Sequence, residues 1–116
     1  MPEKTFKKMS EFYPFYLSQH SKLATRIMHF IGTSLVLAWV FSCIMTEQWL
    51  MILWGLAFGY GPAWIAHFFI EKNRPATFKY PFLSFASDFV MFWHIITGKI
   101  GDQMKRSEEI YGKPAA

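Results

Sequence analysis

Two long stretches of the sequence contain no Asp, Glu, Lys or Arg, and they limit the possible folds more than any other feature. They cover residues 27–45 and 49–70. About 20 apolar residues in a helix cross the hydrocarbon core of a bilayer, and both stretches are close to that length. The helices of a soluble bundle would keep a polar stripe toward water. Because neither stretch has such a stripe, the sequence predicts an integral membrane protein in which both segments cross the bilayer.

The composition agrees with this prediction. Apolar residues make up 53% of the 116 residues and aromatic residues 20%, which is more than the small core of a soluble domain of this length can enclose. The excess apolar surface has to face lipid or protein. The single cysteine, Cys43, lies inside the first apolar stretch and is interpreted as a small buried residue.

A third apolar segment, residues 80–96, is less regular. Its polar members are Ser84, Ser87, Asp88 and His94. The segment is a marginal span by length, and a full crossing would also carry the basic C-terminal tail to the opposite side. A shallow or re-entrant helix with Asp88 facing protein avoids that conflict. Both forms stay open, and His94 is interpreted as a structural residue.

The residues before the first span predict an amphipathic helix. Its apolar members recur at helical spacing: Phe6, Met9, Tyr13, Tyr16 and Leu17. Lysines lie between them, so the helix is expected on a membrane surface, with Pro14 kinking or breaking it. The predicted fold is therefore all-α, with a membrane helical hairpin, a third membrane or re-entrant helix and an N-terminal amphipathic helix. A single integral membrane domain is expected over residues 1–116.

The basic residues are distributed as a membrane hairpin requires. Eight of the 12 Lys and Arg residues lie before the first span or after the second: Lys4, Lys7, Lys8, Lys22, Arg26, Lys72, Arg74 and Lys79. The turn at residues 46–48 has none. By the positive-inside rule, both clusters and the N-terminus are cytoplasmic, in a bacterial inner membrane or the endoplasmic reticulum. Topology thus explains the net charge of +4, and no nucleic-acid partner is predicted.

The histidines lie near the predicted membrane boundary. His29 is at the start of the first span and His67 is near the end of the second, so a hairpin brings them to similar depth. Glu71 follows His67 by four residues, which in an α-helix places it one turn further along the same face. His20 can reach the same place if the chain turns between His20 and His29. We expect Ser21 to cap a helix that begins near Lys22.

Three imidazoles and a carboxylate at one depth suit a divalent metal ion. Neutral imidazole is a good ligand for iron or zinc, and three or four protein ligands leave coordination positions open for substrate and oxygen. A single histidine at a membrane interface can equally serve as a hydrogen-bonding residue. The spacing therefore indicates His20, His29 and His67 as candidate ligands, with Glu71 as a candidate catalytic carboxylate that is either a fourth ligand or a partner of a ligating histidine.

The stretches "FYLSQHSKLATRIMHFIGT" and "GYGPAWIAHFFIEKNRPATFKYP" carry a resemblance. Over residues 12–92 the chain resembles a family of small membrane proteins, one of whose members is an iron(II)-dependent 2-hydroxy-fatty-acid dioxygenase of fatty-acid alpha-oxidation. The specific features are the spacing of His20 and His29, the following Gly32, and His67 with Glu71 and the adjoining lysine. The resemblance implies that His20, His29 and His67 bind Fe(II).

The resemblance also implies the reaction and its partners. A long-chain 2-hydroxy fatty acid and dioxygen would yield the acid one carbon shorter, carbon dioxide and water, with no external reductant. The substrate's carboxylate and 2-hydroxyl could both bind the iron while its alkyl chain lies among the helices. Arg26, Lys72 and Arg74 are candidates to attract the carboxylate, although each can also simply meet phosphates of membrane lipid.

Three other classes of membrane protein are alternatives. A di-iron desaturase or hydroxylase needs about twice the four histidines present. A membrane b-type haem electron carrier can use two histidines on adjacent helices, here His29 and His67, as axial ligands. A non-enzymatic lipid-binding or scaffold protein needs no metal at all.

Overall fold

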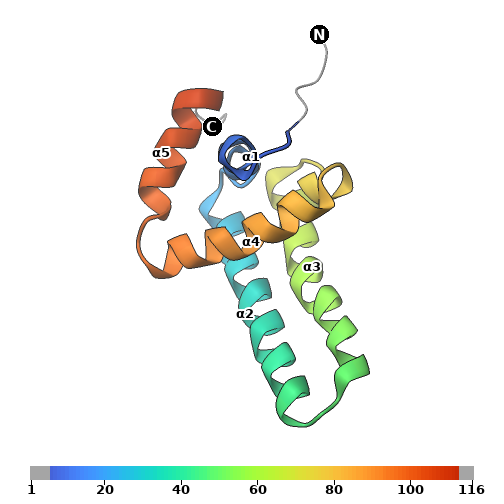
Figure 1. Ribbon diagram of the computed structural model, residues 1–116. Helices are drawn as coiled ribbons and strands as arrows, with labels where there is room; N and C mark the ends of the chain where they lie inside the picture. Colours follow the sequence, from blue (N-terminus) through green and yellow to red (C-terminus); the bar gives the residue numbers. More distant parts are fainter. Residues whose placement is uncertain (1–5, 113–116) are drawn as a thin grey trace. The chain divides into compact units, whose positions relative to one another are not determined.

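The structure is a computed structural model that describes residues 6–112, and all regular structure in that range is helical. Figure 1 shows its elements in chain order: α1 (Met9–Ser18), α2 (Leu23–Met45), η1 (Trp49–Trp54), α3 (Gly55–Ile65), η2 (Ala66–Glu71), η3 (Ala76–Phe78), α4 (Pro81–Ile96) and α5 (Ile100–Tyr111). Two of the short elements, η1 and η3, are 3₁₀-helices, whereas η2 is a π-helix. The predicted all-α fold is confirmed.

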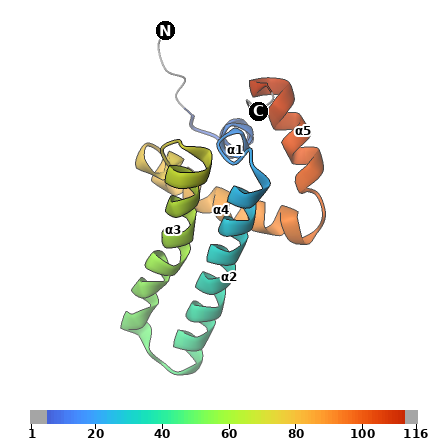
Figure 2. The same ribbon diagram turned by 180° about the vertical axis from the view of Figure 1, so that it is seen from behind.

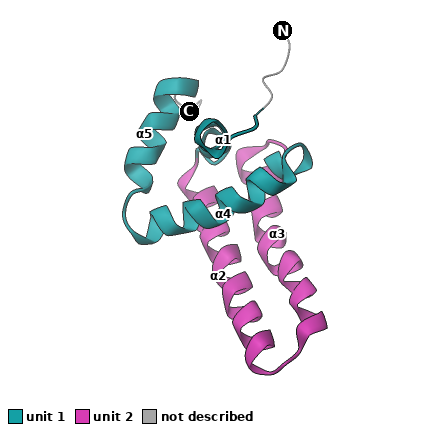
Figure 3. Cartoon of the chain, viewed as in Figure 1, with its two compact units in different colours: residues 1–21, 75–116 teal, residues 22–74 magenta. Residues whose placement is uncertain are grey.

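The helices form two compact units, which Figure 3 distinguishes by colour. Unit 1 combines Met1–Ser21 with Pro75–Ala116, and unit 2 is the continuous segment Lys22–Arg74. The expectation of a single domain over residues 1–116 stays a prediction.

Unit 2 is the predicted helical hairpin. Its two arms, α2 and the consecutive elements η1, α3 and η2, lie side by side in both views (Figures 1 and 2). Both arms, Leu23–Met45 and Trp49–Glu71, are long and apolar enough to cross a membrane. The first helix begins four residues before the expected span, so it includes the polar turn that precedes His29. Lys22 rather than Ser21 is its N-cap residue.

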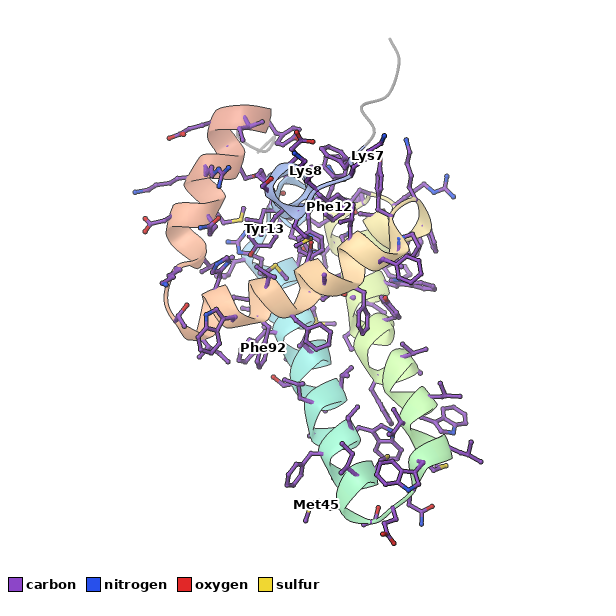
Figure 4. The ribbon with its side chains drawn as sticks, in the orientation of Figure 1. Lys7, Lys8, Phe12, Tyr13, Met45 and Phe92 are labelled. Atoms are coloured by element: carbon purple, nitrogen blue, oxygen red, sulfur yellow. The ribbon has the colours of Figure 1, made fainter. Side chains whose placement is uncertain are left out.

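The outer surface of the hairpin is apolar. Side chains project outward along both arms as far as Met45 beside the turn (Figure 4). Among them Leu50 is 87% exposed and Phe69 74% exposed, which is costly in water but favourable in lipid. At the turn, the indole N–H of Trp39 donates to the carbonyl of Met51 at 2.7 Å. This surface agrees with association of the hairpin with a membrane.

The two arms approach each other closely at a pair of glycines. A Cβ atom added to Gly32 of α2 would lie 2.8 Å from the carbonyl oxygen of Gly59 in α3, and one added to Gly59 would lie 2.7 Å from Val36. Small residues at a helix crossing let two backbones pack closely, which is how helices associate in membranes.

Replacing Gly32 with alanine should therefore destabilise unit 2. The added methyl group meets the backbone of the opposite arm, which cannot rotate away, and overpacking of this kind costs roughly 1 to 3 kcal/mol. Gly55→Ala is the matched control, because its Cβ would find the Trp39 ring at an ordinary 3.5 Å. Denaturant unfolding in detergent measures both. Equal stability of the two variants would contradict the close crossing.

Unit 1 buries the apolar face of the N-terminal helix. Phe12, Tyr13, Tyr16 and Leu17 of α1 form a core with Phe6 and Met91. The predicted amphipathic helix is thus present, but its apolar face packs against protein rather than lying on a membrane. The sequence does not predict α5, which packs against α1. It supplies the Ser107 hydroxyl that donates to the Pro14 carbonyl at 2.7 Å, and α1 continues through this proline.

The third apolar segment forms α4, which begins with Pro81 at its first position and is shorter than the two helices of unit 2. Ser84, Ser87 and Met91 are its buried residues. Asp88 accepts a hydrogen bond from the Tyr16 hydroxyl of α1, so the expectation that this carboxylate faces protein is confirmed. On other sides of α4, Phe82 and Trp93 are exposed.

Candidate metal-binding histidines

His67 lies in the π-helix at the end of the second arm. In this wide turn, the backbone N–H groups of Lys72 and Asn73 both donate to the His67 carbonyl. Lys72 adopts the left-handed conformation, with φ of 59°, which turns the chain back on itself. This turn brings Asn73 to the His67 ring, where Asn73 Oδ1 lies 2.7 Å from Nδ1. π-Helical turns are rare and are often found at functional sites.

The Asn73 contact determines which ring nitrogen of His67 carries the proton. The amide oxygen of Asn73 can only accept, so His67 Nδ1 carries the hydrogen and Nε2 carries the lone pair. Metal-ligating histidines generally donate one ring N–H to a fixed acceptor in this manner, which orients the other nitrogen toward the metal. His67 therefore has the hydrogen bonding of a ligand.

The second histidine of unit 2 faces that lone pair. His29 Nε2 lies 3.3 Å from His67 Nε2, and the two rings are nearly perpendicular, at 83°. Nitrogens bound about 2.0–2.1 Å from one metal ion lie about 3 Å apart when they are neighbouring ligands. The pair thus fits two adjacent positions of a single metal ion. A proton shared between the two nitrogens would be released on metal binding.

The same distance disfavours the haem interpretation. Axial histidines of a b-type haem bind from opposite faces, so their ligating nitrogens are about 4 Å apart with the porphyrin between them. The 3.3 Å approach of His29 and His67 leaves no room for a porphyrin.

A buried hydroxyl on α2 could contact a molecule bound beside His29. Thr25 precedes His29 by four residues and so shares its helix face. Its side chain is fully buried, and Oγ1 has no hydrogen-bond partner among the described residues 6–112. Leaving a buried hydroxyl unpaired costs about 1–3 kcal/mol. A bound molecule beside His29 would supply the partner.

The third histidine, His20, belongs to unit 1, in the turn that follows α1. It is 1% exposed. Its Nδ1 lies 2.7 Å from the Tyr16 carbonyl, and its ring stacks on the Tyr16 ring with centroids 4.2 Å apart. A carbonyl can only accept, so here too Nδ1 carries the hydrogen and Nε2 the lone pair. His20 thus has the same tautomer as His67.

His20, His29 and His67 are all buried, and together they are a group of side chains that could hold a metal ion. Each offers one ring nitrogen.

The fourth histidine, His94, instead has a structural contact in unit 1, where its Nδ1 lies 2.7 Å from the Tyr13 hydroxyl. Burial raises the pKa of Tyr13, while burial and, to a lesser extent, the charge of Lys99 lower the pKa of His94. Both shifts favour a phenol that donates to a neutral imidazole.

Glu71 has a clear structural contact. Its Oε1 accepts the backbone N–H of Lys22 at 2.6 Å, and the Lys22 ammonium donates to the Ile70 carbonyl at 3.0 Å. A carboxylate at the start of a helix satisfies an amide that lacks an internal partner, so Glu71 joins the open ends of the two arms. The α-helical spacing expected between His67 and Glu71 does not apply, because both lie in the π-helix. A part for Glu71 in catalysis stays a prediction.

The basic residues expected to attract a carboxylate lie at the same open end of the hairpin. Arg26 is one turn into α2 and half-buried, whereas Lys72 and Arg74 follow the π-helix and are exposed. Their role toward a substrate stays a prediction.

The contacts of Asn73 and Tyr16 with the histidines were not predicted from the sequence. An asparagine six residues after a histidine would indicate such a contact only if the π-helix between them were already known.

These features define a class: an all-helical chain with two helices able to cross a membrane and a histidine-rich candidate metal centre. The model of the Mpo1-like family, described as 2-hydroxy-palmitic acid dioxygenase Mpo1-like, matches residues 6–100. The chain belongs to this family, and the resemblance seen in its sequence is confirmed. The family's description implies dioxygenase activity. No curated protein and no solved structure matches the chain.

Proposed function

We propose that this protein is an iron(II)-dependent dioxygenase that shortens long-chain 2-hydroxy fatty acids by one carbon, as in alpha-oxidation. The observation that carries the proposal is the buried pair of His29 and His67, whose Nε2 atoms are 3.3 Å apart while Asn73 fixes the tautomer of one ring. Membership of the Mpo1-like family supports the substrate class, because the family's description names a 2-hydroxy fatty acid. The metal's identity and the chain length of the substrate belong to the proposal.

The proposed reaction balances without another reactant. A 2-hydroxy acid, R–CH(OH)–COOH, and dioxygen give R–COOH, carbon dioxide and water. The bond between carbons 1 and 2 breaks, carbon 2 becomes the new carboxyl group, and carbon 1 leaves as carbon dioxide. The substrate supplies all four electrons that dioxygen accepts, so neither nicotinamide nor 2-oxoglutarate is needed.

Iron(II), when bound, would provide a place where dioxygen can accept electrons beside the chelated 2-hydroxy acid. We assign its ligation to His20, His29 and His67. Asn73 and the Tyr16 carbonyl keep the Nδ1 protons of His67 and His20 in place, so that each Nε2 stays available.

The remaining residues are assigned to the substrate. The Thr25 hydroxyl would donate to a substrate oxygen, and Arg26, Lys72 and Arg74 would attract the carboxylate. Glu71 is the proposed catalytic carboxylate, as a fourth ligand or as a partner of a ligating histidine.

Turnover of a long-chain 2-hydroxy acid tests this function. The iron-loaded protein, incubated with the acid under oxygen, should yield the acid one carbon shorter and one carbon dioxide per oxygen consumed. Mass spectrometry and an oxygen electrode measure both. A product of unchanged chain length would overturn the proposal.

We also propose that the open end of the hairpin lies in the cytoplasm, in a bacterial inner membrane or the endoplasmic reticulum. The contacts of Lys22 with Ile70 and Glu71 join the two ends that carry the basic clusters. The turn at Thr46, Glu47 and Gln48 carries no basic side chain, and basic loops remain cytoplasmic.

Single cysteines introduced at Lys8 and Lys79, in a chain with Cys43→Ser, should therefore react with an impermeant thiol reagent only from the cytoplasmic side. A cysteine at Gln48 is the control and should react from the opposite side. Labelling of Lys8→Cys or Lys79→Cys from outside would contradict the orientation.

A further inference from the structure

A chain of three contacts inside unit 1 ends on the His20 imidazole. The carboxylate of Asp88 in α4 accepts a hydrogen bond from the Tyr16 hydroxyl of α1. The Tyr16 ring stacks on the His20 ring with an interplanar angle of 29°. The Tyr16 carbonyl accepts the hydrogen of His20 Nδ1 at 2.7 Å. One tyrosine therefore contacts the imidazole through both its ring and its backbone, and its far end is tied to another helix.

His20 needs such support because of its position in the chain. It lies beyond the last residue of α1, in a turn where its backbone N–H donates to the Leu17 carbonyl at 3.0 Å. A side chain in a turn is less constrained than one on a helix. The stacked Tyr16 ring restricts rotation of the imidazole, and the carbonyl selects its tautomer. Without the Asp88 anchor, the Tyr16 ring could turn away and release the imidazole.

We propose that Tyr16 and Asp88 are positioning residues that act through His20, holding its Nε2 ready to bind the metal. This inference rests on the proposed function, since it takes His20 as a ligand. Partners that orient a ligating histidine typically change metal affinity by about 10- to 100-fold when they are removed. The proposal gives neither residue a direct contact with the metal or the substrate.

The same helix offers a matched control. Tyr13 is also a buried tyrosine of α1, and its hydroxyl lies 2.7 Å from Nδ1 of His94 in α4. Tyr13→Phe therefore removes a hydroxyl from the same helix and breaks a contact with the same partner helix. The Tyr13 hydroxyl contacts His94, which is not a proposed ligand. The Tyr16 hydroxyl instead contacts Asp88 and so anchors the ring that stacks on His20. Any general loosening of unit 1 should appear in both variants.

Metal affinity is measured anaerobically, with the full-length protein competing against a chromophoric chelator for Fe(II). Tyr16→Phe and Asp88→Leu should each weaken Fe(II) binding by about 10- to 100-fold. Because both act through the same contact, the double variant should lose no more affinity than the more severely affected single variant. Asp88→Asn keeps an oxygen acceptor for the Tyr16 hydroxyl and should therefore keep most of the parent's affinity for Fe(II). Tyr13→Phe should bind like the parent protein.

A second readout does not require metal. Nitrogen-15 NMR of histidine-labelled apoprotein reports the tautomer of each ring. In the parent, His20 should carry its proton on Nδ1, and Tyr16→Phe or Asp88→Leu should give a mixture of tautomers while His67 is unchanged. Unaltered affinity and an unaltered His20 tautomer in both variants would overturn the inference.

His20→Ala separates this inference from the proposed function. If His20→Ala loses iron while Tyr16→Phe and Asp88→Leu do not, His20 is a ligand and the positioning role is wrong. If His20→Ala keeps full affinity, the proposed ligand set is wrong, and an inference about holding a ligand fails with it.

Discussion

Protein with His67 replaced by alanine is expected to retain no iron after purification, whereas the parent should hold about one Fe(II) per chain, as a mononuclear site requires. The reason is geometric. His67 offers the lone pair that faces His29 at 3.3 Å, and its tautomer is held by Asn73. Removing this ring leaves His29 without the neighbouring ligand. Elemental analysis of protein loaded anaerobically measures the iron.

His94→Ala is the control for this variant. His94 is a histidine of unit 1 whose observed contact is with the Tyr13 hydroxyl, so its removal should leave the iron content near that of the parent. Circular dichroism should show that both variants keep their helices. Full iron occupancy in His67→Ala would exclude His67 as a ligand, and a Soret band in the parent would favour haem instead.

The second large effect concerns the substrate. A long-chain acid without the 2-hydroxyl should react at least about 10⁴-fold more slowly than the 2-hydroxy acid, because a site built around a hydroxyl rejects analogues that leave its polar groups unpaired. In the proposed reaction, the hydroxyl would be the second substrate oxygen that binds the iron. The buried Thr25 hydroxyl, which has no partner among the described residues, would also lose its proposed acceptor.

Initial rates of product formation, measured by mass spectrometry for acids of equal chain length, test this discrimination. The reaction should proceed without added 2-oxoglutarate or nicotinamide. The 3-hydroxy acid of the same length is the control for polarity alone and should also be inert. Equal rates for hydroxylated and unhydroxylated acids, or an absolute need for a reductant in every turnover, would contradict the proposed reaction. Either result would favour a hydroxylase or an electron carrier instead.

The helical hairpin could be predicted from the sequence because its cause is local. Charge-free runs of sufficient length specify membrane helices by composition alone, and the observed arms exceed the predicted spans by only a few residues. The depth of His29 and His67 then follows from the antiparallel arrangement of two arms of similar length. The same arrangement makes the two histidines candidates to meet, and in unit 2 they are in direct contact.

The contacts around the histidines depend on backbone features that the sequence does not reveal. Asn73 reaches His67 only because residues 66–71 form a π-helix and Lys72 turns left-handed. An α-helix over the same residues would place Glu71, rather than Asn73, near His67, so the sequence alone does not indicate the asparagine. Glu71 instead accepts the Lys22 amide, a contact between residues far apart in the chain.

The environment of the N-terminal helix also could not be predicted. Its apolar residues have the spacing of a helix on a membrane surface, and the same spacing suits a helix packed in a protein core. The choice depends on α4 and α5, which supply Asp88, Met91 and Ser107 as partners of α1. Such partners come from the other end of the sequence, and a periodic pattern alone cannot identify them.

X-ray absorption at the iron edge tests the central claim, a metal centre of three imidazoles, most directly. The spectrum of the anaerobically loaded parent should show nitrogen and oxygen neighbours only, with multiple scattering from three histidine rings. One ring should be lost in any of His20→Ala, His29→Ala or His67→Ala that still holds iron, and none in His94→Ala. A sulfur neighbour, a porphyrin signature, or three rings retained in one of the first three variants would contradict the claim.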